Sequence, residues 1–190
     1  MQKTTLILAA CATLATAAHA DQFSAPMQRY FENEVSLWFT DPAIITAVKR
    51  QNTRNAGLIE ADILALDMQW RAEVGQSNTP TITPVITGAA ADFLRAQIAA
   101  SGGIVSEVFI MDEHGLNVAA SGTTSDYWQG DEAKFTETYS RGAGAIHVGD
   151  VEFDESANGY LGQVSAPIVD PATNTVIGAI TVGLNAEMLF

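Results

Sequence analysis

The chain has 190 residues, of which 47% are hydrophobic, and a formal net charge of −13 at pH 7. This length and hydrophobic content fit one folded domain and argue against a disordered chain. The excess of acidic residues argues against binding to nucleic acid or to anionic lipid surfaces, because like charges repel.

Residues 1–20 have the pattern of an export signal. Lys3 precedes an apolar run over 6–18, and Ala18-His19-Ala20 is a small-x-small cleavage site. The run is shorter than the roughly 20 residues that span a bilayer. We therefore expect a single periplasmic domain over 21–190 with no membrane span.

An alternative processing site lies inside the same segment. Leu8-Ala9-Ala10-Cys11 resembles a lipoprotein box, and acylation of Cys11 would tether the protein to a membrane. Cys11 is the only cysteine, so the exported chain would have no disulfide, no thiolate nucleophile and no cysteine metal site. Loss of Lys3 leaves that chain with a net charge of −14.

The first half of the exported chain shows helical periodicity. A helix is predicted over 25–39, and Asp41 and Pro42 are typical of the N-cap and first residue of a second helix. That helix should reach about Gln51, with an interruption over 52–55. Two hydrophobic stripes recur at three- and four-residue spacing: Met27, Phe31, Val35 and Trp38, then Ile59, Ile63, Leu66 and Trp70. We interpret both stripes as core packing, with contact between two copies of the chain as the alternative.

The second half has the pattern of β-strands. After a loop over 77–84 and a short helix over 88–100, the sequence predicts five strands and one helical insertion. The strands are predicted over 105–111, 117–120, 145–151, 161–169 and 176–184, with the helix over 131–139. An antiparallel sheet needs cover on its apolar face, which the helices can supply. The predicted fold class is α+β, with long N-terminal helices packed on a five-stranded antiparallel meander.

Four segments resemble the PAS-like extracytoplasmic sensor domains called Cache or PDC domains. They are "SLWFTDPAIITAVKRQN" (36–52), "VFIMDEHGLNVAASGTTSDYWQGDEAKF" (108–135), "VGDVEFDES" (148–156) and "GQVSAPIVDPATNTVIGAITVGL" (162–184). The resemblance implies a long N-terminal helix followed by a five-stranded antiparallel sheet. It also implies that a small molecule binds on the sheet, under the connection that here covers 123–148.

Members of that family are usually membrane receptors with a kinase or chemotaxis output. Here the last predicted strand ends at Leu184, close to Phe190, so we expect no output domain. The resemblance then implies a domain that presents ligand occupancy to a membrane sensor kinase or chemoreceptor. The alternative is a ligand-free periplasmic protein that docks on a sensor kinase or forms a homodimer through its N-terminal helix.

The connection after the second strand holds the densest polar and aromatic cluster. Tyr127 and Trp128 are candidate walls of a ligand site, and Gln129 is a candidate donor and acceptor. Asp131 is a further candidate, with capping of the next helix as its other role, and Lys134 could hold a carboxylate. Amino-acid-binding members of the family carry an arginine beside a Trp-Tyr pair. The reversed order here, with no arginine shortly before it, argues against amino-acid recognition.

Four later residues complete the predicted ligand-binding set: His147, Asp154, Gln163 and Ser165. The motif Asp150-x-Glu152-x-Asp154 resembles the start of a calcium loop, but the required glycine and final glutamate are missing. The sequence contains no nucleophile elbow, zinc-protease motif or phosphate-binding loop. We therefore expect that the partner is a small molecule. We expect no enzymatic activity, no metal and no cofactor.

Overall fold

A computed structural model describes the backbone of residues 14–155 and 158–190 and the side chains from Gln22 onward, except 156–157. Lys3 and Cys11 of the predicted export signal lie outside the described residues. The helices are α1 (Leu14–Asn33), η1 (Val35–Trp38), α2 (Pro42–Asn55), α3 (Glu60–Glu73), α4 (Thr83–Ile86), α5 (Ala89–Ala100), α6 (Ala133–Thr136), η2 (Tyr139–Arg141) and η3 (Ala186–Leu189). The strands are β1 (Val105–Met111), β2 (Asn117–Ala120), β3 (His147–Val148), β4 (Glu152–Asp154), β5 (Gly159–Asp170) and β6 (Thr175–Asn185). None of the described helices is both long enough and apolar enough to cross a membrane.

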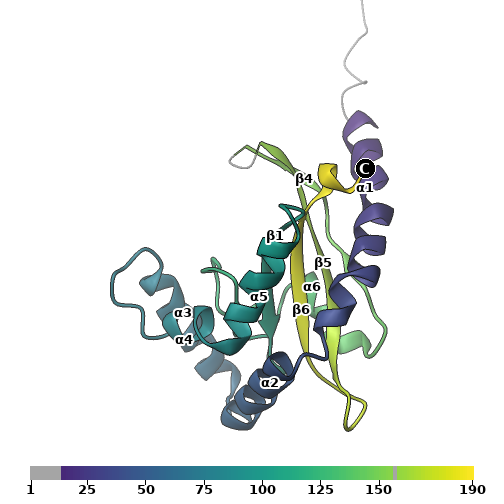
Figure 1. Cartoon of the computed structure of the whole chain (residues 1–190). Helices are drawn as coiled ribbons and strands as arrows, with labels where there is room; N and C mark the ends of the chain where they lie inside the picture. The colour runs from purple at the N-terminus through teal and green to yellow at the C-terminus, as the bar shows by residue number, and fades with distance from the viewer. Residues whose placement is uncertain (1–13, 156–157) are drawn as a thin grey trace, which may run out of the picture.

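The sheet is antiparallel, with strand order β2-β1-β6-β5-β3 and β4 paired to β5 (Figure 1). The predicted α+β class is confirmed, but the predicted meander is wrong because β1 pairs with β6. The residues of β6 from Gly178 to Leu184 are all buried, which suits a central strand covered on both faces. Within the strand predicted over 145–151 only His147 and Val148 form a strand, β3. Strand β4 follows at 152–154, beyond the predicted bounds, and both β3 and β4 pair with β5.

Helices α1, α2 and α5 cover one face of the sheet, as Figure 1 shows. The predicted stripe of Met27, Phe31, Val35 and Trp38 is buried there against Val164, Ile180 and their neighbours, which confirms its interpretation as core. Association of two copies through the N-terminal helix stays a prediction. Phe23 extends this packing by stacking on Tyr160 of β5, with ring centroids 5.4 Å apart.

Helix α2 begins as predicted and ends later than predicted. The Asp41 side chain accepts a hydrogen bond from the Ala43 backbone N–H at 2.8 Å, which confirms the N-cap. The helix does not stop at Gln51 but continues to Asn55. The reason is a tertiary contact, because Gln51 and Asn55 are both buried and donate hydrogen bonds to the carboxylate of Asp112, at 3.1 and 2.8 Å.

The second face of the sheet is covered by a smaller cluster. Helix α6 and η2 contact β5 and β6, while α3 and α4 pack at the β2 edge. The buried side chains of this cluster include Ile63, Trp70, Ile82, Val85, Phe109, Met111, Tyr127 and Phe135. Helix α6 is shorter than the helix predicted over 131–139, and the single turn of α4 begins at Thr83, inside the predicted loop over 77–84.

The turn between β5 and β6 holds a buried carboxylate. Asp170 accepts a hydrogen bond from Lys49 Nζ at 2.6 Å and another from the Ala172 backbone N–H at 3.0 Å. The lysine, and then the backbone bond, hold the pKa of Asp170 below its ordinary value near 3.8. The ionised form is thus favoured by folding, and this stabilisation is complete above the ordinary pKa.

We expect the wild-type protein to lose this contribution as the pH falls through the lowered pKa of Asp170. Urea unfolding at pH 6 and pH 3 should therefore show a smaller acid-induced loss of stability in Asp170→Asn than in wild type. Asp92→Asn, which changes an exposed carboxylate, is the control and should behave like wild type. An equal loss in wild type and Asp170→Asn would contradict the prediction.

Candidate functional site

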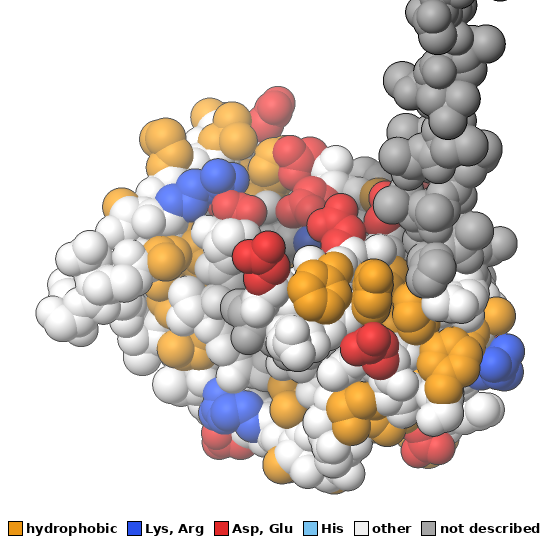
Figure 2. Space-filling model, turned by 90° about the horizontal axis from the view of Figure 1, so that it is seen from above, with side chains coloured by type: hydrophobic (Ala, Val, Ile, Leu, Met, Phe, Trp, Pro, Cys, Tyr) orange, Lys and Arg blue, Asp and Glu red, His pale blue; other side chains and the backbone are white. Residues whose placement is uncertain are grey.

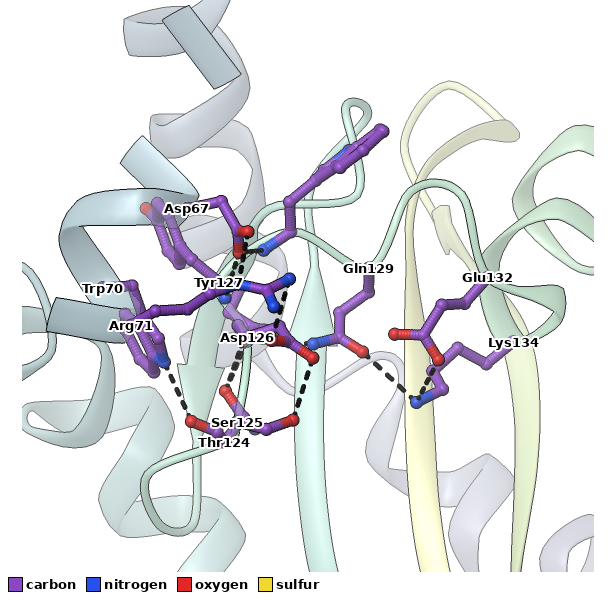
Figure 3. Close-up of polar contacts among 12 residues, drawn as sticks. Asp67, Trp70, Arg71, Thr124, Ser125, Asp126, Tyr127, Gln129, Glu132 and Lys134 are labelled. Carbon is purple, nitrogen blue, oxygen red and sulfur yellow. Dashed lines mark hydrogen bonds and ion pairs between the residues drawn. The ribbon is translucent and has the colours of Figure 1, made fainter. Parts of the chain in front are cut away.

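Helix α3 holds the connection after β2 in place through one carboxylate. Asp67 Oδ1 accepts hydrogen bonds from the backbone N–H groups of Tyr127 and Trp128, at 2.9 and 3.1 Å. Arg71, one turn later, donates to Asp67 Oδ2 at 2.8 Å and lies 3.0 Å from Asp126 (Figure 3). Asp67 is buried, so these donors replace the water that its charge would otherwise require. The loop is thus fixed to a helix that lies 60 residues earlier.

Aromatic packing fixes the same segment. Trp70 is fully buried and stacks on Tyr127, with ring centroids 5.1 Å apart and an angle of 7° between the planes. The Trp70 indole N–H donates to the Thr124 backbone carbonyl at 2.9 Å. Burial, aided by the charge of Asp112, raises the pKa of Tyr127 to about 12. The Tyr127 hydroxyl is therefore neutral at physiological pH and can donate a hydrogen bond.

Residues 127–129 run beside the hairpin turn that joins β1 and β2. The Asn117 N–H donates to the Tyr127 carbonyl at 3.0 Å, and the Gln129 N–H donates to the Gly115 carbonyl at 2.8 Å. The Trp128 indole N–H donates to the His114 carbonyl at 2.8 Å. Trp128 thus anchors the loop on the turn, whereas its place in a ligand wall stays a prediction.

Gln129 and Lys134 come together under the loop. Lys134 Nζ lies 3.2 Å from Gln129 Oε1 and 3.0 Å from Glu132 Oε2, and 5.4 Å from the centre of the Phe109 ring. Gln129 is buried, whereas Asp131 is exposed. The N-cap of α6 is Glu132, and its side chain makes no capping hydrogen bond. The prediction that Asp131 caps this helix is wrong, because the helix starts two residues after Asp131.

The part of the sheet below this loop is closed. Phe109, Thr181, Ser165 and His147 are register partners in one row across β1, β6, β5 and β3. Ser165 is fully buried, and its hydroxyl lies 2.9 Å from the Thr181 hydroxyl. His147 is half-buried at the edge of the row. Ser165 therefore has its hydrogen-bond partner within the protein and lies beneath the loop.

The next row of the same face is open. Glu107, Gly183 and Gln163 lie two residues along from Phe109, Thr181 and Ser165, so they share their face. They form the floor of a cavity of about 330 Å³, with Gln163 Nε2 donating to Glu107 Oε1 at 2.8 Å. Its other walls include Asp150, Glu152, Phe153 and Asp154. We call it the sheet-face cavity. Figure 2 shows acidic side chains gathered near the middle of this end of the molecule, beside exposed hydrophobic ones.

The sheet-face cavity contains two of the predicted ligand-binding residues, Gln163 and Asp154. It also contains Glu107, which sequence reasoning missed. The available signal was a single acidic residue within the predicted strand over 105–111. Tyr127 lines a different cavity, on the side of α2. Among the residues that the structure describes, no group of three or more His, Cys, Asp or Glu side chains is placed to hold a metal ion.

No family model matches this sequence, and no curated protein matches it. Solved structures do match in fold. The ligand-binding domain of the Campylobacter jejuni chemoreceptor Tlp3, solved with 4-methylisoleucine, is 11% identical with a TM-score of 0.41 over 93% of this chain and 62% of its own. The ligand-binding domain of the Pseudomonas aeruginosa PAO1 amino acid chemoreceptor PctC, solved with GABA, is 11% identical with a TM-score of 0.45 over 91% and 61%. The sensor domain of the V. cholerae histidine kinase DctB is 9% identical with a TM-score of 0.34 over 93% and 59%.

This chain spans less than two thirds of the length of each of these three domains. All three are sensory domains of chemoreceptors or of a histidine kinase, and the likeness to this chain concerns the general fold alone.

Proposed function

We propose that this protein is a periplasmic sensory domain that binds a small molecule in the sheet-face cavity. The observation that carries the proposal is the cavity itself, which lies on the sheet next to the row of Phe109, Thr181 and Ser165. Its floor belongs to the paired strands β5 and β6, so the binding groups are held on rigid elements. The export signal in the sequence supports the periplasmic location.

The lining of the cavity favours a ligand with a positive charge. Glu107, Asp150, Glu152 and Asp154 line it, and none of the described lysine or arginine side chains does. A carboxylate binds an ammonium group through charge-assisted hydrogen bonds, and the half-exposed ring of Phe153 offers a surface to which cations are attracted. The ligand class we propose is therefore a small amine, bound without chemical conversion.

The signalling role we propose is that ligand occupancy is presented to a membrane sensor kinase or chemoreceptor. Two walls of the cavity differ in how they are held. The floor lies in the centre of the sheet, whereas β4 pairs with β5 alone. A ligand that contacts both Glu107 and β4 would join these two parts, and a partner could detect the joined state.

The test is a thermal-shift series with putrescine, choline and ethanolamine, each matched to an uncharged analogue. A ligand that binds only the folded state at about 100 times its Kd adds about 2.7 kcal/mol, which should raise the Tm by about 5 °C or more. Glu107→Gln should weaken binding by about tenfold, because it removes the charge but keeps an acceptor for Gln163.

Glu60→Gln is the matched control, since Glu60 is exposed on α3. It should leave the amine response unchanged. If no amine raises the Tm after the protein has been unfolded and refolded to remove carried-over ligand, the amine class is wrong. If uncharged molecules and carboxylates also fail, the ligand-free interaction protein becomes the better hypothesis.

A further inference from the structure

Two further cavities lie away from the sheet-face cavity, between α2 and the α4–α5 region. The first encloses about 270 Å³ beside α2, the segment 80–85 and Tyr127. The second encloses about 410 Å³ between α2 and the start of α5. Both are lined by Ala47, Arg50, Pro84 and Val118, so they adjoin. We call the two together the arginine cavity.

The cations of this cavity have no acidic partner among the described residues. Lys3 lies outside the described residues, and of the eight other lysine and arginine side chains five form ion pairs: Lys49, Arg71, Arg95, Lys134 and Arg141. Within the described part of the chain, Arg29, Arg50 and Arg54 form none. Two of these three, one helical turn apart on α2, line the arginine cavity. Although the protein has many carboxylates, neither of these two neighbouring arginines forms an ion pair with a described one.

Arg54 has hydrogen-bond donors to spare. It donates through Nη2 to Gln51 Oε1 at 2.9 Å and through Nε to Asn55 Oδ1 at 3.5 Å, which leaves three of its five N–H groups without a partner among the described residues. Tyr127 lines the same end, and its hydroxyl is hydrogen-bonded to Gln51. At the other end, Gly88 precedes α5 and gives that helix no side-chain cap, and Gly88, Ala89 and Ala90 belong to the lining.

The rest of the lining is apolar. Ala47, Leu66, Val85 and Val118 line the arginine cavity, and none of the described aspartates and glutamates lines either of its two parts. Three buried acids accept hydrogen bonds from lining residues: Asp67 from Tyr127, Glu73 from Thr81 and Asp112 from Gln51. Asp112 also accepts from Asn55 and from the backbone of His114 and Leu116, at 2.8 to 3.0 Å. Asp112 therefore does not compete for the two arginines.

We propose that the arginine cavity binds a small organic carboxylate with an apolar body. The carboxylate is held by Arg50 and Arg54, and the apolar body lies on Val118, Val85 and Leu66. Arginine suits this role because its planar fork matches the two oxygens of a carboxylate. This site goes beyond the proposed function: it lies at other residues, has the opposite charge and takes the opposite class of ligand.

The test uses octanoate and suberate as probes, with octanamide as the uncharged control. Octanoate or suberate should raise the Tm of the wild-type protein, and Arg50→Gln and Arg54→Gln should each weaken the binding by about tenfold or more. Arg29→Gln is the matched control, because it removes the other unpaired arginine, which is exposed on α1. It should bind octanoate as wild type does, and octanamide should bind about tenfold more weakly than octanoate.

Two results would overturn this site. One is that neither carboxylate raises the Tm, and the other is that Arg50→Gln and Arg54→Gln bind the probes as tightly as Arg29→Gln. Near-ultraviolet circular dichroism of each variant shows whether the Trp70–Tyr127 stack is intact, which separates loss of binding from loss of fold. The amine response of the sheet-face cavity should survive in both arginine variants and weaken in Glu107→Gln. The experiment can therefore reject one proposed site without rejecting the other.

Discussion

Gly115→Ala is expected to lower the free energy of unfolding by about 4 kcal/mol, from a strained backbone and an overpacked contact together. Gly115 has φ of +81°, which L side chains rarely adopt. A Cβ at this position would also lie 2.4 Å from Gly130 Cα and 2.7 Å from the Gly130 nitrogen. Both atoms belong to the backbone, so no side chain can move to relieve the contact. The loop after β2 would have to separate from the hairpin turn.

Gly75→Ala is the matched control for this prediction. Gly75 has nearly the same φ, +78°, but none of the described atoms lies within 4 Å of the place that an alanine methyl group would occupy. It should therefore cost only the backbone strain, about 1 kcal/mol. Urea unfolding of the two variants measures the difference. Equal costs would show that the close approach of Gly115 to Gly130 does not stabilise the loop.

Trp70→Ala is expected to cost about 4 kcal/mol, in the range measured for large aromatic side chains removed from a core. Trp70 is fully buried, and its removal leaves a void under Tyr127 and an unpaired carbonyl at Thr124. The near-ultraviolet circular dichroism of the stacked pair should be lost as well. Urea unfolding gives the cost.

Met68→Ala is the control on the same helix, because Met68 is 68% exposed, and it should change stability by less than about 0.5 kcal/mol. Trp70→Phe keeps a ring against Tyr127 but loses the indole N–H, so it should fall between the two. If Trp70→Ala were as mild as Met68→Ala, the stack would not be what holds the loop on α3.

Much of the fold could be predicted because its signals are local. The bounds of β1 and β2 match the prediction, since a hydrophobic run, a turn and a second run are adjacent in the chain. The cap at Asp41 is also local. The strand order could not be predicted in this way. In the predicted meander β1 is an edge strand, whereas β1 also pairs with β6, a contact between segments far apart in sequence. The same holds for the end of α2, which depends on Asp112.

Two of the residues proposed from the sequence as ligand contacts, Gln163 and Asp154, line the sheet-face cavity, and their role as ligand contacts stays a prediction. Tyr127 and Trp128 were recognised as an aromatic pair, but their anchoring by Asp67 has no sequence signal, because Asp67 is one acidic residue among many on a helix. Arg50 and Arg54 show nothing unusual in sequence either. Their lack of acidic partners within the described part of the chain is visible only once the chain is folded.

The position of β6 in the sheet has a consequence for how the protein folds. Val182 pairs with Val108 on one side and with Val164 on the other, so β6 joins the hairpin of β1 and β2 to the rest of the sheet. The sheet therefore cannot close until residues 175–185 have taken their place, and the edge of β1 stays unpaired before then. Pairing over such sequence distances slows folding, because the entropy of closing a long loop is lost before the contacts form. An exposed strand edge is also where unfolded chains associate, so the yield of refolding should depend on protein concentration.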